Sequence, residues 1–381
     1  MSITRRSLLG RLGVGAAAVA AGPALADAAF ASVLAPSARS TGGMLRLHRN
    51  ENGYGPSPRV MRALQEASAA TVQRYPEVEA EALRRTLATL HGVTTDHLVL
   101  GCGSTDLLRM AAGAFLGART NIVTALPTFD AISRFAEQRG ARVAALPLTE
   151  QHAHDLDSML GAVDASTRLV YICNPNNPTG TLTRRQDLEH FLRKLPSDVF
   201  VVIDEAYHHY VDPTAEYASF VDRPIGDPRV IVTRSFSKLF GLAGVRLGYA
   251  VAAPATARLL SACAIPDSVS ALASSAAASA IDDAEHIEMT VQRNANERQE
   301  FFNQANARMV RAIDSHTNFV MLNTGRSAVE VVQHFKENNI TLPQPFPTFE
   351  NYIRVSLGTT AEMCEFWRVW DLMPVHNMAH E

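Results

Sequence analysis

The chain has 381 residues, of which 47% are hydrophobic, and a formal net charge of −3 at pH 7. This length and composition allow a sizeable core and two domains or lobes. Basic residues are scattered among acidic ones in blocks of two at most, so the sequence predicts no nucleic-acid surface, and we expect small-molecule partners. The four cysteines form no CxxC pair, which favours neither a zinc site nor a redox motif.

The N-terminus has the pattern of an export signal. Residues 4–9 read Thr-Arg-Arg-Ser-Leu-Leu, a twin-arginine pattern, and a weakly apolar stretch over 12–21 precedes the small-residue site Ala24-Leu25-Ala26. We expect a signal peptide over 1–26, cleavage after Ala26 and a periplasmic or otherwise exported mature protein. The apolar stretch is too short and too rich in glycine for a stable membrane span, although a disordered alanine-rich tail would have a similar composition.

Short apolar strands alternate with helices through the middle of the chain. Strands are expected at 97–100, 121–125, 141–146, 168–173, 199–203, 230–233 and 247–252, with helices at 106–115, 128–139 and 184–195 between them. This alternation predicts an α/β fold in which a mostly parallel sheet carries helices on both faces.

The remaining elements flank this region. Helices are expected at 59–70, 77–91 and 284–306, and strands at 318–322 and 352–357. We expect a linker and N-terminal segment over 27–70, a large domain over 71–267, and a small domain over 268–381 that also takes in the N-terminal segment.

Chemically unusual residues follow the strands, where ligands gather in a parallel sheet. Gly103, Ser104 and Thr105 open a helix after the first strand, a phosphate-cradling pattern that an ordinary helix cap would share. Phe129 follows the second strand and can stack on a flat cofactor, although core packing is the commoner fate of a phenylalanine.

The fourth and fifth strands end in polar residues. Asn177 lies in the proline- and asparagine-rich turn over 174–180, which can hold an amide against a ligand hydroxyl. Asp204 needs a cationic partner, and a protonated pyridine nitrogen would be one; capping of the next turn is the alternative. Tyr207, three residues on, can hydrogen-bond the phenolic oxygen of such a ring.

Lys238 follows an apolar strand in the segment Ser-Phe-Ser-Lys-Leu-Phe-Gly-Leu-Ala-Gly-Val-Arg over 235–246. A lysine there can form a Schiff base with a carbonyl when burial and neighbouring cations lower its pKa. Ser235, Ser237 and Arg246 supply hydroxyl donors and a permanent cation, which suit the phosphate of pyridoxal phosphate. A solvated turn lysine, with Arg246 in a surface ion pair, would give the same local pattern.

Six motifs occur in order: Asn-Glu-Asn-Gly-Tyr-Gly-Pro at 50–56, Asn-Pro-Asn-Asn-Pro-Thr-Gly at 174–180, Asp-Glu-Ala-Tyr at 204–207, Ser-Phe-Ser-Lys at 235–238, Gly-Val-Arg-Leu-Gly at 244–248 and Tyr-Ile-Arg-Val-Ser-Leu-Gly at 352–358. Together they resemble the fold-type I pyridoxal-phosphate enzymes of the class I/II aminotransferase family, most closely the histidinol-phosphate aminotransferase branch. The resemblance implies a mostly parallel seven-stranded sheet in a large domain with a smaller α+β domain. It also implies ping-pong transfer of an amino group from an amino acid to a 2-oxo acid.

The resemblance further implies roles for single residues. Lys238 would carry the internal aldimine and move the proton between substrate carbon and cofactor, and Asp204 would hold the pyridine nitrogen. Asn177 and Tyr207 would contact the phenolic oxygen, and Phe129 would stack on the ring. The phosphate would be bound by the start of the helix and the lysine segment, through Gly103, Ser104, Thr105, Ser235, Ser237 and Arg246.

Substrate and subunit contacts are implied in the same way. Arg354 would clamp the carboxylate or an equivalent anionic group of the substrate, with Asn177 beside it. Tyr54 would reach the cofactor phosphate and substrate of the neighbouring subunit, so the resemblance implies a homodimer with shared active sites.

One departure bears on the substrate. Histidinol-phosphate enzymes commonly carry a second arginine before the position of Arg354, which helps to hold the substrate phosphate, whereas this chain has Pro343 there. With the export pattern, this disfavours histidinol phosphate and favours an amino acid without phosphate. A pyridoxal-phosphate-dependent decarboxylase or amino-acid oxidase is the alternative, because the cofactor site is shared. A cofactor-binding regulator is disfavoured, since no helix-turn-helix precedes the motifs.

Overall fold

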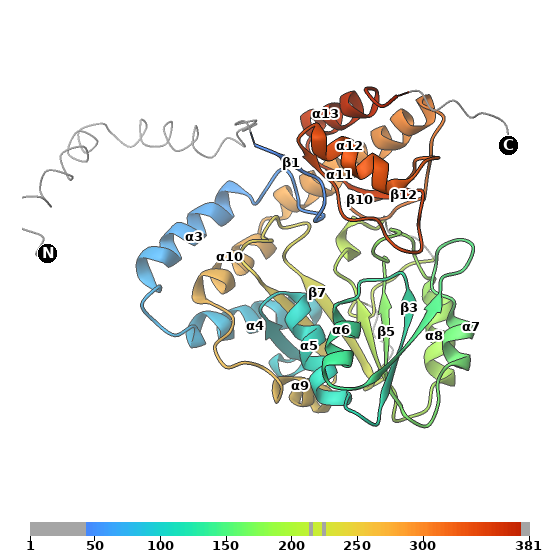
Figure 1. Ribbon diagram of the computed structural model, residues 1–381. Helices are drawn as coiled ribbons and strands as arrows, with labels where there is room; N and C mark the ends of the chain where they lie inside the picture. The colour runs from blue at the N-terminus through green and yellow to red at the C-terminus, as the bar shows by residue number, and fades with distance from the viewer. Residues whose placement is uncertain (1–42, 213–215, 223–225, 375–381) are drawn as a thin grey trace, which may run out of the picture. The chain divides into compact units, whose positions relative to one another are not determined.

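The computed structural model describes residues 43–212, 216–222 and 226–374, so the predicted signal peptide and most of the linker lie outside the described residues. A seven-stranded sheet is its central element (Figure 1). The strands are β2 (Leu98–Gly101), β3 (Asn121–Leu126), β4 (Arg142–Pro147), β5 (Thr167–Cys173), β6 (Phe200–Asp204), β7 (Val230–Ser235) and β8 (Gly248–Ala252). Their order is β2-β8-β7-β6-β5-β3-β4, and only β8 pairs antiparallel with its neighbours among these strands. The predicted mostly parallel sheet is confirmed.

Helices cover both faces of this sheet because successive strand residues point to opposite sides. Leu169, Tyr171 and Cys173 pack toward α5 (Ser104–Phe115), α6 (Ala131–Gln138) and α9 (Pro254–Ser261). Val170 and Ile172 pack toward α7 (Leu156–Gly161) and α8 (Arg185–Lys194). Strands buried on both faces therefore read as continuous apolar runs.

The helix after β3 begins later than predicted. We expected it to start at Thr128, whereas α6 begins at Ala131. The Thr128 hydroxyl donates to Asn176 Oδ1 at 2.7 Å, in the turn that follows β5. This contact holds residues 127–130 as a loop at the carboxyl end of β3.

Two smaller sheets are formed by the C-terminal part of the chain, and one of them includes the N-terminal strand. β10 (Phe319–Asn323) pairs antiparallel with β9 (Arg311–Ala312) and β12 (Tyr352–Ser356), and α11 (Ala284–Ala307), α12 (Ala328–Glu337) and α13 (Thr360–Trp370) pack around them. β1 (Leu45–Arg46) pairs parallel with β11 (Ile340–Thr341), so the N-terminal segment joins the C-terminal part of the chain.

The boundary predicted at residue 268 stays a prediction. α10 (Ala271–Ile281) packs on α3 (Pro58–Ala70) and α4 (Glu77–His91) rather than on the small sheets. No helix within the described ranges is long and apolar enough to cross a membrane.

A buried ion pair fixes the ends of β6 and β7, where the predicted site lies. Arg234 and Glu205 are buried, and Arg234 Nη2 lies 3.0 Å from Glu205 Oε2. The Ser219 hydroxyl also donates to Glu205, at 2.6 Å. Removing one partner of such a pair costs about 3–5 kcal/mol, because the other charge is left buried and unpaired. Since Glu205 follows Asp204 and Arg234 precedes Ser235, the pair holds two site residues in place.

Candidate active site

A cavity of about 880 Å³ opens at the carboxyl ends of the parallel strands. Its wall combines loops that follow the strands of the large sheet with β12 and the N-terminal segment. The predicted site residues that line it are Ser104, Thr105, Phe129, Asn177, Asp204, Tyr207, Ser235, Ser237, Lys238, Arg246 and Arg354. The fold therefore brings together side chains from distant parts of the sequence.

One end of the cavity is suited to an anion. α5 begins at Ser104, and the first amide groups of a helix lack intrahelical partners and lie at its positive end. Arg246 Nη1 donates to Ser237 Oγ at 3.2 Å, and Ser235 Oγ accepts the Ser237 amide at 3.1 Å. Gly103 does not line the cavity, but a Cβ at this position, where φ is +80°, would collide with the Arg246 guanidinium. Glycine therefore lets the arginine approach the helix start.

Asp204 brings a buried carboxylate to the cavity. It ends β6 and is 2% exposed. Its Oδ1 accepts the Ala206 amide at 3.2 Å, and its Oδ2 accepts the Tyr171 hydroxyl at 3.0 Å. Burial raises the pKa of Asp204, which forms no ion pair with another described residue, although the charge of Lys238 is near enough to interact with it. Because a buried carboxylate is costly without a positive partner, this side chain is placed to receive one from a ligand.

Tyr207 and Asn177 form a polar group beside Asp204. The Tyr207 hydroxyl accepts from Asn50 Nδ2 at 3.0 Å and lies 3.5 Å from Asn177 Nδ2. No role was predicted for Asn50. Its backbone has a φ of +53°, and its Oδ1 accepts a hydrogen bond from Ser356 Oγ at 3.1 Å. Its signal was present in the motif at 50–56, but the partners that reveal its role are distant in sequence.

Lys238 is half-buried in the cavity wall. Its Nζ donates to the backbone carbonyls of Arg49 at 3.0 Å and Asn50 at 3.1 Å. Burial, together with the nearby Arg354 and Arg246 guanidinium groups, lowers the pKa of Lys238 to about 7. A solvated turn lysine would have neither these contacts nor this environment.

Arg354 enters the cavity from β12, on the side opposite the large sheet. It is 9% exposed, and its guanidinium lies 5.4 Å from the Phe319 ring and 5.6 Å from the Phe346 ring. Its Nη1 donates to Asn177 Oδ1 at 2.5 Å and its Nη2 to the His48 carbonyl at 2.7 Å. The Nε is buried without a partner, so the guanidinium keeps a donor for an anionic ligand.

Phe129 and Tyr54 take different positions. Phe129 is half-buried, packs on the apolar cluster beneath the sheet and also lines the cavity; its stacking on a cofactor stays a prediction. Tyr54 does not line this cavity; its hydroxyl donates to Glu297 Oε1 at 3.3 Å, and Arg293 lies 4.8 Å from its ring. Its role toward a neighbouring subunit stays a prediction.

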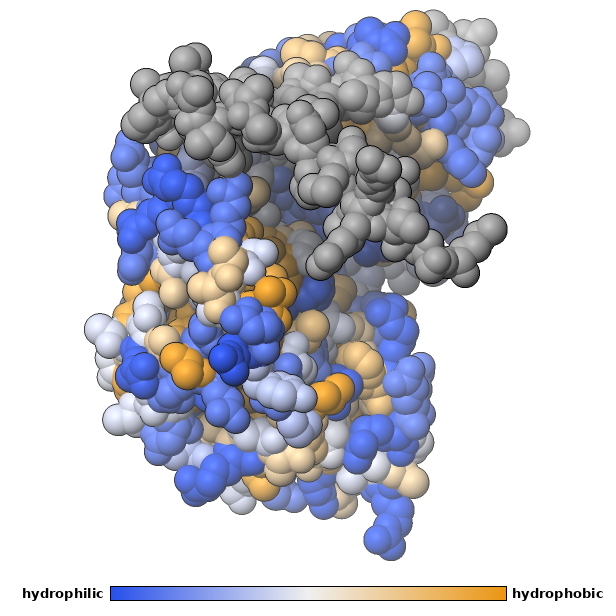
Figure 2. Space-filling model, turned by 90° about the vertical axis from the view of Figure 1, so that its left-hand side faces the viewer, coloured by the Kyte–Doolittle hydropathy of each residue, from blue (hydrophilic) through white to orange (hydrophobic). Residues whose placement is uncertain are grey.

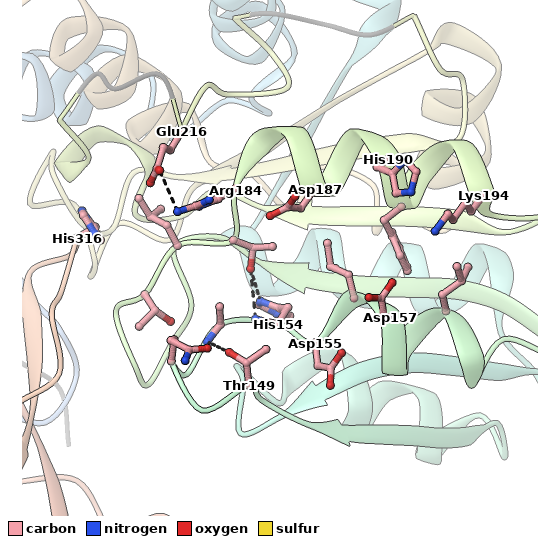
Figure 3. Close-up of a pocket in the computed structure, with 18 of the residues that line it drawn as sticks. Thr149, His154, Asp155, Asp157, Arg184, Asp187, His190, Lys194, Glu216 and His316 are labelled. Carbon is pink, nitrogen blue, oxygen red and sulfur yellow. Dashed lines mark hydrogen bonds and ion pairs between the residues drawn. The ribbon is translucent and has the colours of Figure 1, made fainter.

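A second cavity, of about 990 Å³, lies beside α7 and α8 (Figure 3). Its wall mixes acids and bases: Arg184 pairs with Glu216 at 3.1 Å, and Asp155, Asp187 and Lys194 also line it. None of the predicted site residues contributes to its wall. The two cavities are similar in size, but the first holds the half-buried lysine together with the buried carboxylate and arginine, so the active site is assigned there.

Comparison with known proteins agrees with this geometry. Residues 43–367 match the family model of class I and II aminotransferases. The chain belongs to this family. The aminotransferase is 35% identical to a histidinol-phosphate aminotransferase of Shouchella clausii over 323 residues, which cover 84% of this chain and 86% of the relative.

Two solved structures show the same fold. A histidinol-phosphate aminotransferase from Sinorhizobium meliloti in complex with pyridoxal-5'-phosphate is similar with a TM-score of 0.80 and 28% identity, covering 87% of this chain and 92% of that one. An L-threonine-O-3-phosphate decarboxylase from Porphyromonas gingivalis has a TM-score of 0.74 at 23% identity, covering 86% and 98%. The latter likeness concerns the fold alone.

The aminotransferase uses pyridoxal phosphate, and the cavity fits this cofactor. The helix start with Arg246 suits a phosphate, the buried Asp204 lacks a positive partner, and Lys238 offers an amine that is largely neutral above pH 7.

The pKa of Lys238 gives the first prediction. Because only the neutral amine attacks a carbonyl, the rate at which the apoprotein captures added pyridoxal phosphate should rise with pH and reach half its maximum near pH 7, rather than near 10.5. Arg354→Met removes a cation that lowers this pKa, so its midpoint should move to higher pH. Stopped-flow absorbance of the cofactor measures both rates. A wild-type midpoint above pH 9 would contradict the assignment.

Proposed function

We propose that this aminotransferase transfers the amino group of an amino acid without phosphate to a 2-oxo acid, and that both substrates bind in turn between Lys238 and Arg354. The observation that carries this proposal is the placement of an amine with a pKa of about 7 and a buried arginine in one cavity. Arg354 supplies the cation for a carboxylate, which amino acids and 2-oxo acids share.

The roles follow from the contacts described above. When bound, pyridoxal phosphate supplies a carbonyl for the amine and a ring that withdraws electrons from the substrate carbon. Lys238 Nζ, neutral above pH 7, takes the proton from that carbon and returns it. Asp204 holds positive charge at the ring nitrogen, and Asn177 and Tyr207 orient the phenolic oxygen. The phosphate would be held by Ser104, Thr105, Ser235, Ser237 and Arg246.

Apolar side chains on the substrate side support a donor without phosphate. Pro343, which stands where the related enzymes commonly have an arginine, lines the cavity together with Phe346 and Pro347. Leu126 lines it as well and is 51% exposed, although it is a large hydrophobic residue. These apolar side chains offer contact area to an apolar substrate side chain, and Pro343 cannot form the charged contact with a phosphate that an arginine would; the uncharged Gln344 and Thr348 lie next to them in the wall.

The visible absorption of the holoenzyme tests the function. Adding a single amino acid without an oxo acid should bleach the cofactor band, and a 2-oxo acid should restore it. Lys238→Ala should lose at least a thousandfold in turnover while still retaining cofactor through the phosphate contacts. A band that does not bleach, or one that recovers with release of carbon dioxide or uptake of oxygen, would instead indicate the decarboxylase or oxidase.

We also propose that the protein is exported through the twin-arginine route. The support is the sequence pattern over 4–9 with its apolar stretch and small-residue site. Replacing Arg5 and Arg6 by Lys keeps the charge but removes the pattern, so the variant should accumulate uncleaved in the cytoplasm. Cell fractionation with immunoblotting reads the outcome, and a twin-lysine variant that is still processed and exported would exclude this route.

A homodimer with shared active sites is proposed as well. Three exposed hydrophobic residues lie close together in sequence, Val72 and Tyr75 in the connection between α3 and α4 and Val78 in the first turn of α4, and Tyr75 is 80% exposed. The side of the molecule on which α3 lies also shows apolar patches among hydrophilic residues (Figure 2). Contiguous exposed apolar surface marks a protein interface more often than free surface.

Light scattering coupled to gel filtration should give twice the chain mass for the mature protein. Tyr75→Glu should shift the mass toward the monomer at micromolar concentration, because it places a charge on the apolar connection. Glu77→Gln, a polar change at the start of α4 nearby, serves as the control and should leave the mass unchanged. A fully active monomer would contradict the shared site.

A further inference from the structure

Tyr171 is a buried residue that touches the site without lining it. It lies in the middle of β5 with 0% exposure, and its hydroxyl donates to Asp204 Oδ2 at 3.0 Å. It does not contribute to the cavity wall, so it cannot contact a ligand there directly. Any influence on the chemistry passes through Asp204.

Strand register explains how this contact arises. β5 and β6 pair so that Cys173 lies opposite Asp204 and Tyr171 lies opposite Val202. Alternate residues share a face, so Tyr171 is on the face of Asp204 and one diagonal step back from the strand end. Diagonal neighbours on adjacent strands are within reach of an aromatic side chain. The phenol therefore approaches the carboxylate from inside the sheet, and the end of β6 stays free for a ligand.

The hydrogen bond from Tyr171 stabilises the charged form of the Asp204 carboxylate. Burial alone raises the pKa of Asp204 and so favours a neutral acid, which would stabilise a ring cation poorly. A hydrogen bond donated to the carboxylate favours the charged form and acts against burial. Burial also raises the pKa of Tyr171 well above its ordinary value, so the phenol remains a donor throughout the working range of pH.

We propose that Tyr171 is a positioning residue for the cofactor, which keeps Asp204 ionised and oriented so that the ring nitrogen of bound pyridoxal phosphate stays protonated. The proposal rests on the role proposed for Asp204. The neighbouring thiol does not take this part, because Cys173 Sγ donates to the Pro175 carbonyl at 3.3 Å. The Ala206 amide contacts the other carboxylate oxygen, Oδ1, and the Thr233 hydroxyl and the Lys238 amine also favour the charged form of Asp204.

The test uses holoenzyme loaded with ¹⁵N-labelled pyridoxal phosphate, whose nitrogen shift reports protonation directly. Tyr171→Phe removes one oxygen and leaves the ring in place. Without the donor Asp204 holds its charge less well, so the pH at which the ring nitrogen loses its proton should fall by about one unit or more. The kcat should fall about tenfold or more, with little change in KM, because the substrate contacts are intact.

Two further variants show whether a change in the titration of the ring nitrogen comes from the contact between Tyr171 and Asp204. Thr256→Val removes another buried hydroxyl, one that donates to the Pro228 carbonyl at 2.6 Å and does not line the cavity, and should leave the nitrogen titration unchanged. Asp204→Asn should leave the nitrogen unprotonated at neutral pH. If Asp204→Asn has no effect, the role of Asp204 is wrong and the proposed function needs revision.

If Asp204→Asn changes the titration and Tyr171→Phe does not, Tyr171 is structural only and the inference is overturned. Should Tyr171→Phe fail to fold, 3-fluorotyrosine at position 171 keeps the shape and makes the phenol a stronger donor. The nitrogen should then retain its proton to higher pH than in the natural protein. A shift to lower pH, or none, would also overturn the proposal.

Discussion

The active site depends on charges that are kept in one cavity without neutralising each other. Asp204 is buried and receives hydrogen bonds from Tyr171 and Ala206, but it forms no ion pair with another described residue. Isolating a buried charge in this way costs several kcal/mol, which a ligand with the opposite charge recovers on binding. Arg354, on the other side of the cavity, has aromatic rings and neutral oxygens as neighbours. Each charge therefore remains available to a different part of a ligand.

Backbone carbonyls of the N-terminal segment hold Lys238 and Arg354 in separate positions. Lys238 and Arg354 donate to backbone carbonyls of residues 48–50, and Asn318 donates to the Asn50 carbonyl at 3.0 Å. The pairing of β1 with β11 anchors the same segment to the C-terminal part of the chain. An amine of Lys238 bonded to pyridoxal phosphate would give up hydrogen bonds to these carbonyls. Binding would thus be an exchange of partners, with a net free energy smaller than the sum of the new contacts.

The sequence predicts much of this arrangement because the strands are buried on both faces and end in polar residues. Asp204 and Lys238 each follow an apolar run, which places them at one edge of a parallel sheet. Other residues carry no such signal. Tyr171 lies inside an apolar run and reads as core, and Asn50 contacts Tyr207 and Ser356 only after distant segments meet. α10 was not predicted because its alanine-rich sequence is buried against α3 and α4 and lacks helical periodicity.

Under the proposed function, the cavity wall formed by Leu126, Pro343 and Phe346 would favour apolar over phosphorylated substrates in two ways. A hydrogen bond between an arginine and a phosphate contributes about 1.5–3 kcal/mol, so under the proposed function Pro343 in place of an arginine would weaken binding of a phosphorylated substrate by roughly tenfold to a hundredfold. Each additional methylene buried against an apolar wall favours an apolar substrate by about 1–3 kcal/mol. Leu126 and Phe346 supply such a wall on the same cavity. The two effects add, because a phosphate would lose its donor and also desolvate against apolar groups. Arg354, which serves any carboxylate, leaves the choice of side chain to this wall.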